Sequence, residues 1–110
     1  VDSYHLQRSG NDPGVLCQLS PGEIAYVQYS DVPLDGLKPG MITDRLPPGE
    51  GTVPFVEFFQ RLGEQGYRGY LSYEAPNPSA WARNPEEVAR EALLATRKLL
   101  AVGRSEHAVN

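Results

Sequence analysis

The sequence predicts an α/β fold in which the strands run parallel. Two short segments, 24–29 and 70–73, are rich in β-branched and aromatic residues and are bordered by turn-forming residues. Segments with helical signals precede, separate and follow them, at 15–19, 52–62 and 85–102. Because strands that alternate with helices form βαβ units, the two strands are expected to pair in parallel.

The first two predicted helices have recognisable start signals. Asp12 comes before Pro13, a pair typical of the N-cap and the first position of a helix. Thr52 is expected to cap the second helix, with Pro54 in its first turn. The apolar face predicted for this second helix contains Phe55, Val56, Phe59 and Leu62.

The last predicted helix has the clearest boundaries. Asn84 and Pro85 supply an N-cap and a first position, and two acidic residues follow in the first turn. Gly103 is expected to end the helix. The chain is therefore divided into one domain at 1–103 and a flexible tail at 104–110.

Composition excludes several classes of partner. The chain has 110 residues, a net charge of −4 and no run of basic residues, so neither nucleic acid nor an anionic membrane is expected to bind it. No apolar run approaches the roughly 20 residues that a membrane span needs, and no signal peptide is visible. The single cysteine, Cys17, excludes an intrachain disulfide and favours a reducing compartment, so we expect a cytoplasmic protein.

Three polar residues fall at the ends of successive strand segments: Asp2, Gln28 and Glu74. The carboxyl ends of parallel strands meet at one side of a sheet, where α/β proteins place their chemistry, so these side chains are expected to converge. Carboxylate and carbonyl oxygens suit Mg²⁺ or Mn²⁺. The alternative for each residue alone is that it caps a strand or begins a loop.

Two further residues are candidates for substrate contact. His5 lies just after Asp2, and a neutral imidazole there can hydrogen-bond a hydroxyl or move a proton; a purely structural role is the alternative. Arg45 lies in a long loop rich in Pro and Gly, 32–51, and can clamp a substrate oxygen or an anion. The Gly-Glu-Gly that ends this loop lacks the spacing and the Lys-Ser/Thr of a P-loop.

Four segments, taken in order, resemble the C-terminal part of the sugar phosphate isomerase/epimerase family, which belongs to the xylose-isomerase-like (β/α)8 barrels. The resemblance covers Val1 to about Leu100 and implies the end of strand six, then strands seven and eight with their helices. The segments are Asp2-Ser-Tyr-His5, Ile24-Ala-Tyr-Val-Gln-Tyr-Ser-Asp31, Arg45-Leu-Pro-Pro-Gly-Glu-Gly51 and Gly66-Tyr-Arg-Gly-Tyr-Leu-Ser-Tyr-Glu74.

The resemblance also implies a metal site. Family members bind one divalent cation through four side chains at strand ends, and Asp2 and Glu74 match two of these ligands. Gln28 falls where many members have His and where the dehydroshikimate dehydratase branch has Gln. His5 and Arg45 match residues that contact substrate oxygens. The fourth ligand, a Glu from an earlier strand, has no counterpart here, so Mn²⁺ or Mg²⁺ is expected only if the site is completed.

The implied reaction is isomerisation or epimerisation of a small keto-sugar or polyol through an enediolate. The metal would stabilise the enediolate, Glu74 would move a proton, and His5 and Arg45 would orient the substrate. Gln28 favours a first alternative, a lyase of the dehydroshikimate dehydratase type. A second alternative is a non-catalytic oligomerising or binding module that retains the barrel segment. That the chain is an enzyme rests on the resemblance alone.

The site is expected to be incomplete in this chain. The predicted strands are too few to close an eight-stranded barrel, and they would leave unpaired edges. The sequence also has no initiator Met, and the pattern that begins at Asp2 starts almost at the first residue. We therefore expect a fragment of a longer protein, or self-association that supplies the missing walls, and no activity in the isolated chain.

Overall fold

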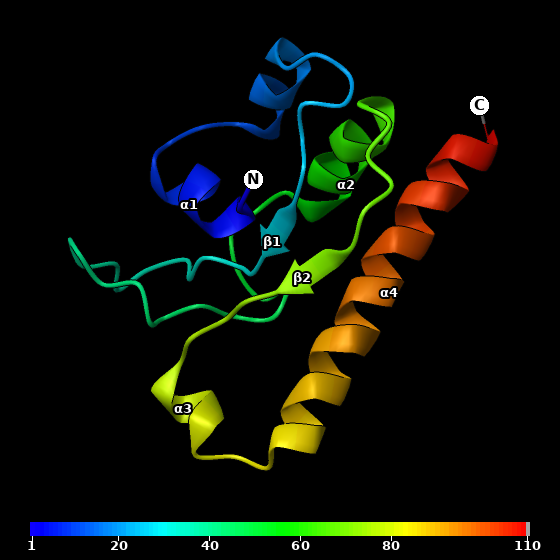
Figure 1. Cartoon of the computed structure of the whole chain (residues 1–110). Coiled ribbons are helices and arrows are strands. Elements are labelled where there is room, and N and C mark those ends of the chain that lie inside the picture. Colours follow the sequence, from blue (N-terminus) through cyan, green and yellow to red (C-terminus); the bar gives the residue numbers. More distant parts are fainter. Residues whose placement is uncertain (110) are drawn as a thin grey trace.

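A computed structural model of the chain describes the backbone of residues 1–109 and the side chains of residues 1–103. It has two parallel strands packed against helices, so the predicted α/β class is confirmed (Figure 1). Within the described residues, no helix is long and apolar enough to cross a membrane. The elements in chain order are α1 (Ser3–Arg8), the 3₁₀ helix η1 (Pro13–Gln18), β1 (Val27–Tyr29), α2 (Phe55–Glu64), β2 (Leu71–Tyr73), α3 (Pro78–Trp81) and α4 (Pro85–Val109).

The sheet has two strands and one further bridge at the N-terminus. β1 and β2 pair in parallel, and the register places Gln28 opposite Ser72. On the other side of β1, Asp2 forms a parallel bridge with Gln28, and the Gln28 N–H donates to the Val1 carbonyl at 2.8 Å. The lateral order is therefore Asp2, β1, β2. Both strands are shorter than predicted; the first loses residues 24–26, of which Tyr26 is half exposed.

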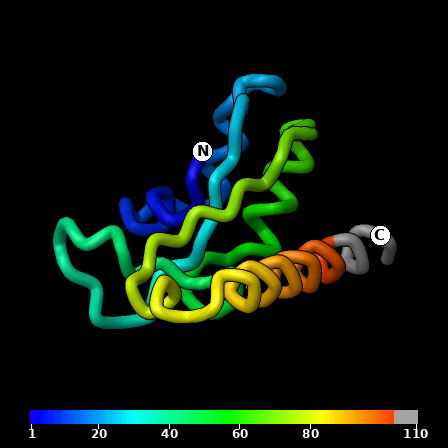
Figure 2. Tube along the Cα trace, turned by 60° about the horizontal axis from the view of Figure 1, so that its bottom comes forward, coloured from blue at the N-terminus to red at the C-terminus, as the bar shows by residue number. Residues whose placement is uncertain are grey.

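The core lies between one face of this sheet and helices α2 and α4. Tyr29 of β1 makes edge-to-face contacts with Phe55 and Phe59 of α2, at centroid distances of 6.2 and 6.0 Å. Its hydroxyl lies 2.7 Å from the Thr96 hydroxyl of α4. Burial raises the pKa of Tyr29, and the hydrogen bond with Thr96 opposes this shift. Figure 2 shows α4 extending across the molecule beside these strands and α2.

Two of the three predicted helix starts are confirmed. The side chains of Asp12 and Asn84 accept hydrogen bonds from backbone N–H groups two residues ahead, at 2.7 and 2.9 Å. The prediction that Thr52 caps α2 is wrong, because the N-cap is Pro54 and no side chain caps this helix. Thr52 instead directs its backbone N–H to the Val32 carbonyl at 2.9 Å, which ties it to the segment after β1.

The buried face of α2 differs from the prediction at three positions. Phe55, Phe58 and Leu62 are buried, whereas Val56 and Phe59 are only partly covered. Spacings of three and four residues place the buried set on one helical stripe, which faces η1 as well as α4. Phe58, which the prediction omitted, packs against Phe55 and Phe59 at ring-centroid distances of 6.0 and 5.8 Å.

The last helix is longer than predicted. α4 continues through Gly103 to Val109, so the prediction that Gly103 ends the helix is wrong. Gly103 is also absent from the glycines with positive φ, the conformation that a helix-ending glycine adopts. The flexible tail predicted for 104–110 lies outside the residues whose side chains are described, and the division at residue 103 stays a prediction.

Candidate functional site

The three residues predicted as metal ligands belong to the sheet face that α2 and α4 leave uncovered. Successive side chains of a strand point to opposite faces, and residues in register point to the same face. Tyr29 faces the helices, so Gln28 and its register partners Asp2 and Ser72 face the other way. The ladder continues beyond β2, because the Glu74 N–H donates to the Tyr29 carbonyl at 3.1 Å. Glu74, two residues after Ser72, therefore belongs to this uncovered face.

Asp2 both ends a strand segment and begins α1. Its backbone is extended, with φ −134° and ψ 119°, and its Oδ1 accepts hydrogen bonds from the Tyr4 N–H at 2.8 Å and the His5 N–H at 3.4 Å. This cap explains why a six-residue helix forms where no helix was predicted. The second carboxylate oxygen lies 3.5 Å from Nη1 of Arg45. Asp2 therefore caps a helix, whereas the alternative named for it was the cap of a strand or the start of a loop.

Arg45 connects the predicted site residues to one another. Its side chain is only 5% exposed, and its Nε donates to the Ile42 carbonyl at 3.0 Å. Nη2 lies 3.2 Å from Nε2 of His5, and Nη1 lies near Asp2 and 3.5 Å from the Glu74 carbonyl. The guanidinium is thus held by the protein on several sides, whereas the Glu74 and His5 residues are exposed.

Tyr4 belongs to this cluster and was missed by sequence reasoning. Its side chain is fully buried, and the Arg45 guanidinium lies 4.4 Å from its ring centroid, a cation–π contact. The hydroxyl bonds to the Asp44 carboxylate and lies 3.1 Å from the Met41 carbonyl. Burial, and then the hydrogen bond and charge of Asp44, raise the pKa of Tyr4 to about 12. The contact of Tyr4 with Arg45 depends on the position of α1, a helix that was not predicted from the sequence.

Asn77 attaches Arg45 to the loop that follows β2. Its Nδ2 donates to the Arg45 carbonyl at 3.0 Å, and its Oδ1 accepts from the Ser79 N–H at 2.9 Å, which caps α3. The Arg45 N–H donates to the Pro76 carbonyl at 3.4 Å. A sequence signal was available, because Asn77 before Pro78 repeats the cap pattern that correctly predicted the start of α4.

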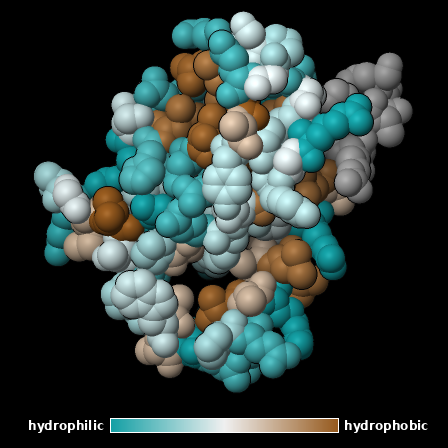
Figure 3. Space-filling model, viewed as in Figure 1, coloured by the Kyte–Doolittle hydropathy of each residue, from teal (hydrophilic) through white to brown (hydrophobic). Residues whose placement is uncertain are grey.

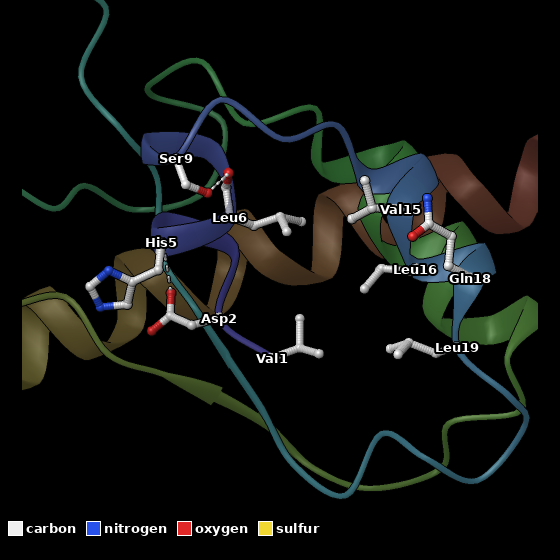
Figure 4. A pocket seen from close by; sticks show the side chains of 9 residues that line it. All are labelled: Val1, Asp2, His5, Leu6, Ser9, Val15, Leu16, Gln18 and Leu19. Carbon is white, nitrogen blue, oxygen red and sulfur yellow. Dashed lines mark hydrogen bonds between the residues drawn. The ribbon is translucent and has the colours of Figure 1, made fainter.

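An apolar cavity of about 450 Å³ lies beside Asp2 on the edge of the sheet (Figure 4). Asp2 and His5 form its polar margin, and in Figure 4 the Asp2 carboxylate and the His5 ring point to the same side, away from the apolar wall. The apolar residues of this wall are Val1, Leu6, Val15, Leu16 and Leu19.

A second hollow, of about 330 Å³, lies beyond β2 between α3 and the start of α4. Figure 3 shows the opening below the strands, with hydrophobic residues along its margin. Trp81 lines it and is 66% exposed. Tyr73 lines it from β2, and burial, followed by the charge of Glu50, raises the pKa of Tyr73 to about 12. Two largely apolar hollows thus lie near the sheet, one beside Asp2 and one beside Tyr73 of β2.

The donors in the uncovered face fit a hard divalent cation in type. Asp2, Gln28 and Glu74 supply two carboxylates and one amide oxygen, the ligands that Mg²⁺ and Mn²⁺ prefer. Within the described residues, no group of three or more His, Cys, Asp and Glu side chains could hold a metal, so any site here depends on the Gln28 amide. These three donors are fewer than the six that such ions take, and the metal set stays a prediction.

Comparison with known proteins gives a consistent result. A model of the xylose isomerase-like TIM barrel family matches residues 1–99. The inosose dehydratase of Lacticaseibacillus casei is 31% identical over 105 residues, which cover 83% of this chain and 34% of that protein. The putative L-ribulose-5-phosphate 3-epimerase SgbU of Escherichia coli (strain K12) is 33% identical over 97 residues, which cover 87% of this chain and 32% of that protein. The chain thus spans about a third of the length of these relatives.

Two solved structures resemble the fold. A xylose isomerase domain protein from Alicyclobacillus acidocaldarius superposes with a TM-score of 0.79 at 32% identity, over 94% of this chain and 37% of that one. The IolI protein, solved with a bound zinc atom, superposes with a TM-score of 0.71 at 23% identity, over 96% of this chain and 37% of that one.

Proposed function

Because this chain belongs to the family of xylose isomerase-like TIM barrels, we propose that it forms part of a divalent-metal site that isomerises or epimerises a keto-sugar or polyol. One observation carries the proposal: Asp2, Gln28 and Glu74 belong to the sheet face that α2 and α4 leave uncovered. There Arg45 connects Asp2, His5 and Glu74. The similarity to a putative L-ribulose-5-phosphate 3-epimerase supports this class of substrate.

The strands take the places of strands seven and eight in this proposal, and Asp2 ends strand six. Their parallel pairing and the helices after each strand agree with this assignment. An eight-stranded barrel requires further strands on both sides, beyond Asp2 and beyond β2. In this proposal the missing strands pair with these two open edges, and they come either from a longer protein or from further copies of the chain.

The residues present divide the chemical work between them. A divalent cation, when bound, polarises the substrate carbonyl and a neighbouring hydroxyl. The exposed Glu74 would take a proton from the carbon next to the carbonyl, and the electron pair left behind would move onto the carbonyl oxygen. Arg45 and His5 would hold substrate oxygens and offset this charge. An epimer forms when a second acid, the counterpart of the Glu expected from an earlier strand, gives a proton to the opposite face of the same carbon. An isomer forms when the proton returns to the former carbonyl carbon and the proton of the neighbouring hydroxyl passes to the former carbonyl oxygen.

Calorimetric titration with Mn²⁺ and Mg²⁺ tests the metal site. We expect binding by the chain, and binding at least about tenfold weaker in Asp2→Asn and Glu74→Gln. Asn caps a helix as well as Asp does, so Asp2→Asn isolates the loss of charge from the loss of the cap. Asp35→Asn, an exposed carboxylate in the long loop, is the matched control. An unmodified chain that binds neither ion would contradict the metal site and favour the non-catalytic module.

A second candidate, a metal-dependent lyase, is favoured by Gln28 and by the similarity to an inosose dehydratase. Here the same proton removal would be followed by loss of a β-hydroxyl as water. Product analysis with Mn²⁺ on inosose, dehydroshikimate and L-ribulose 5-phosphate separates the two: a dehydrated product supports the lyase, and an epimer supports the isomerase class. Metal binding without turnover of any of the three agrees with the expected incomplete site.

Self-association is the remaining part of the proposal. Size-exclusion chromatography with light scattering is expected to give a mass above the 12.1 kDa of one chain, because exposed apolar side chains and open sheet edges favour pairing between chains. A stable monomer with well-dispersed NMR signals would contradict self-association. It would favour the alternative, a fragment of a longer protein.

A further inference from the structure

Asp31, which follows β1, has a completely buried carboxylate. The carboxylate accepts four backbone hydrogen bonds: Oδ2 from the Gly49 and Gly51 N–H groups at 2.8 and 2.9 Å, and Oδ1 from those of Val32 and Val53 at 2.9 Å each. No Lys, Arg or His among the residues described here forms an ion pair with it. Its charge is therefore balanced by main-chain dipoles.

The backbone of Asp31 is bonded to Leu46, at the start of the loop that contains Gly49, Gly51 and Val53. Its N–H donates to the Leu46 carbonyl at 2.7 Å, and its carbonyl accepts from the Leu46 N–H at 3.1 Å, which forms an isolated antiparallel bridge. One residue thus attaches both ends of the segment 46–53, which we call the Asp31 loop. Arg45 comes directly before this loop, so Asp31 constrains the main chain from which the Arg45 side chain extends.

The glycines of the Asp31 loop fit this carboxylate closely. A Cβ at Gly51 would lie 2.0 Å from the Val32 carbonyl oxygen and 2.7 Å from Oδ1 of Asp31. Gly49 has φ +95°, a conformation that other residues rarely adopt. A side chain at 51 would push the loop away from Asp31. The two glycines therefore allow the backbone N–H groups to reach the carboxylate.

We propose that Asp31 is a positioning residue for the functional site: its carboxylate fixes the Asp31 loop and thereby places Arg45 against Asp2 and His5. This rests on the proposed function insofar as Arg45 contacts substrate oxygens there. The role requires an acceptor on both oxygens. In Asp31→Asn, the amide NH₂ meets N–H groups instead of accepting from them, although the volume and shape of the side chain are kept.

NMR of the chain without metal or substrate tests the proposal. In Asp31→Asn we expect the Arg45 Nε–H to exchange at least about tenfold faster with solvent and the His5 ring signals to shift, because Arg45 is no longer held in place. The methyl signals of Val27 and Leu62, in the core, should stay where they are. Asp35→Asn is the matched control and should change none of these signals. A folded Asp31→Asn chain that retains the Arg45 and His5 signals would overturn the proposal.

A second variant covers the case in which Asp31→Asn does not fold. Asp31→Ala removes the carboxylate and leaves its N–H partners around an open space, which the formate ion can enter. Formate should restore the slow exchange of Arg45 Nε–H, and chloride at equal ionic strength should not. Failure of formate to restore it would overturn the proposal. Neither experiment uses a metal. A chain that binds no Mn²⁺ would therefore contradict the proposed function, whereas the positioning role of Asp31 is decided by the exchange of Arg45 Nε–H and by the His5 ring signals.

Discussion

Nη1 of Arg45 lies 3.5 Å from Oδ2 of Asp2, and the two side chains are only 5% and 14% exposed. The ion pair joins the loop between β1 and α2 to the first residues of the chain. Its charges are further satisfied, because Asp2 accepts backbone hydrogen bonds and Arg45 donates to the Ile42 carbonyl. Such a pair is costly to break from one side, since the remaining charge stays buried.

Replacing Arg45 by Met should therefore destabilise the chain. We expect the free energy of unfolding to fall by about 3 kcal/mol, the cost of leaving one charge of a buried pair alone. Urea denaturation followed by circular dichroism measures it. Arg68→Met removes an exposed arginine and should change the free energy by less than about 0.5 kcal/mol. Equal effects at the two positions would show that the Arg45 contacts do not contribute to stability.

Adding a methyl group at two glycines should have opposite effects. Gly51→Ala should destabilise the chain by about 2 kcal/mol or more, because the new Cβ would meet the Val32 carbonyl oxygen at 2.0 Å. Gly63→Ala, inside α2 with no atom within 4 Å of the new Cβ, should stabilise it by about 0.5–1 kcal/mol. Thermal unfolding gives both signs. A stabilising Gly51→Ala would contradict the close approach of the Asp31 loop.

Local signals in the sequence predicted local structure well. Asp12 and Asn84 were identified as helix caps because a cap bonds to N–H groups within a turn of itself, so no distant residue is involved. The parallel pairing of the strands also followed from the order of the elements. Thr52 failed as a cap because its partner, the Val32 carbonyl, lies in a different segment of the chain.

Contacts between distant segments could not be predicted in the same way. His5 and Arg45 were each proposed to bind substrate, but nothing in the sequence indicated that they lie 3.2 Å apart. Tyr4 and Asp31 were missed because their roles depend on how α1 and the Asp31 loop pack, not on neighbouring residues. The family resemblance proposed the site residues, and the fold was needed to show which contacts hold them.

The two Asn caps should differ in their contribution to stability. Asn84→Ala removes one helix cap and should cost about 1 kcal/mol. Asn77→Ala removes a cap and also the hydrogen bond from Nδ2 to the Arg45 carbonyl, so its cost should be about 1 kcal/mol larger. Chemical denaturation of the two variants side by side measures the difference. A smaller loss at Asn77 would indicate that its bond to Arg45 contributes nothing.

Alkaline pH should destabilise the chain through two phenols, the buried Tyr4 and the partly buried Tyr73. The pKa of Tyr4 and of Tyr73 is raised from 10 to about 12 in the folded chain, so both favour folding fully below pH 10. This stabilisation is lost as the pH rises from 10 through 12, because the unfolded chain releases these protons first. Tyr73→Phe should reduce the fall in unfolding free energy over this range, measured by urea denaturation at each pH. An unchanged slope in Tyr73→Phe would contradict the assignment, and Tyr26→Phe, at a half-exposed tyrosine, is the control.

Position 28 should determine how tightly the site holds a metal. Gln28 is in register with Asp2 and belongs to the uncovered face, so a ligand there shares the proposed site with Asp2 and Glu74. Imidazole binds Zn²⁺ and Mn²⁺ more strongly than an amide oxygen does, so Gln28→His should raise the affinity for Zn²⁺ by about tenfold or more. Gln28→Leu, which has no donor, should lower it. If calorimetry gives the same Zn²⁺ affinity for the His and the Leu variants, residue 28 is not a ligand, and the metal site must be built without it.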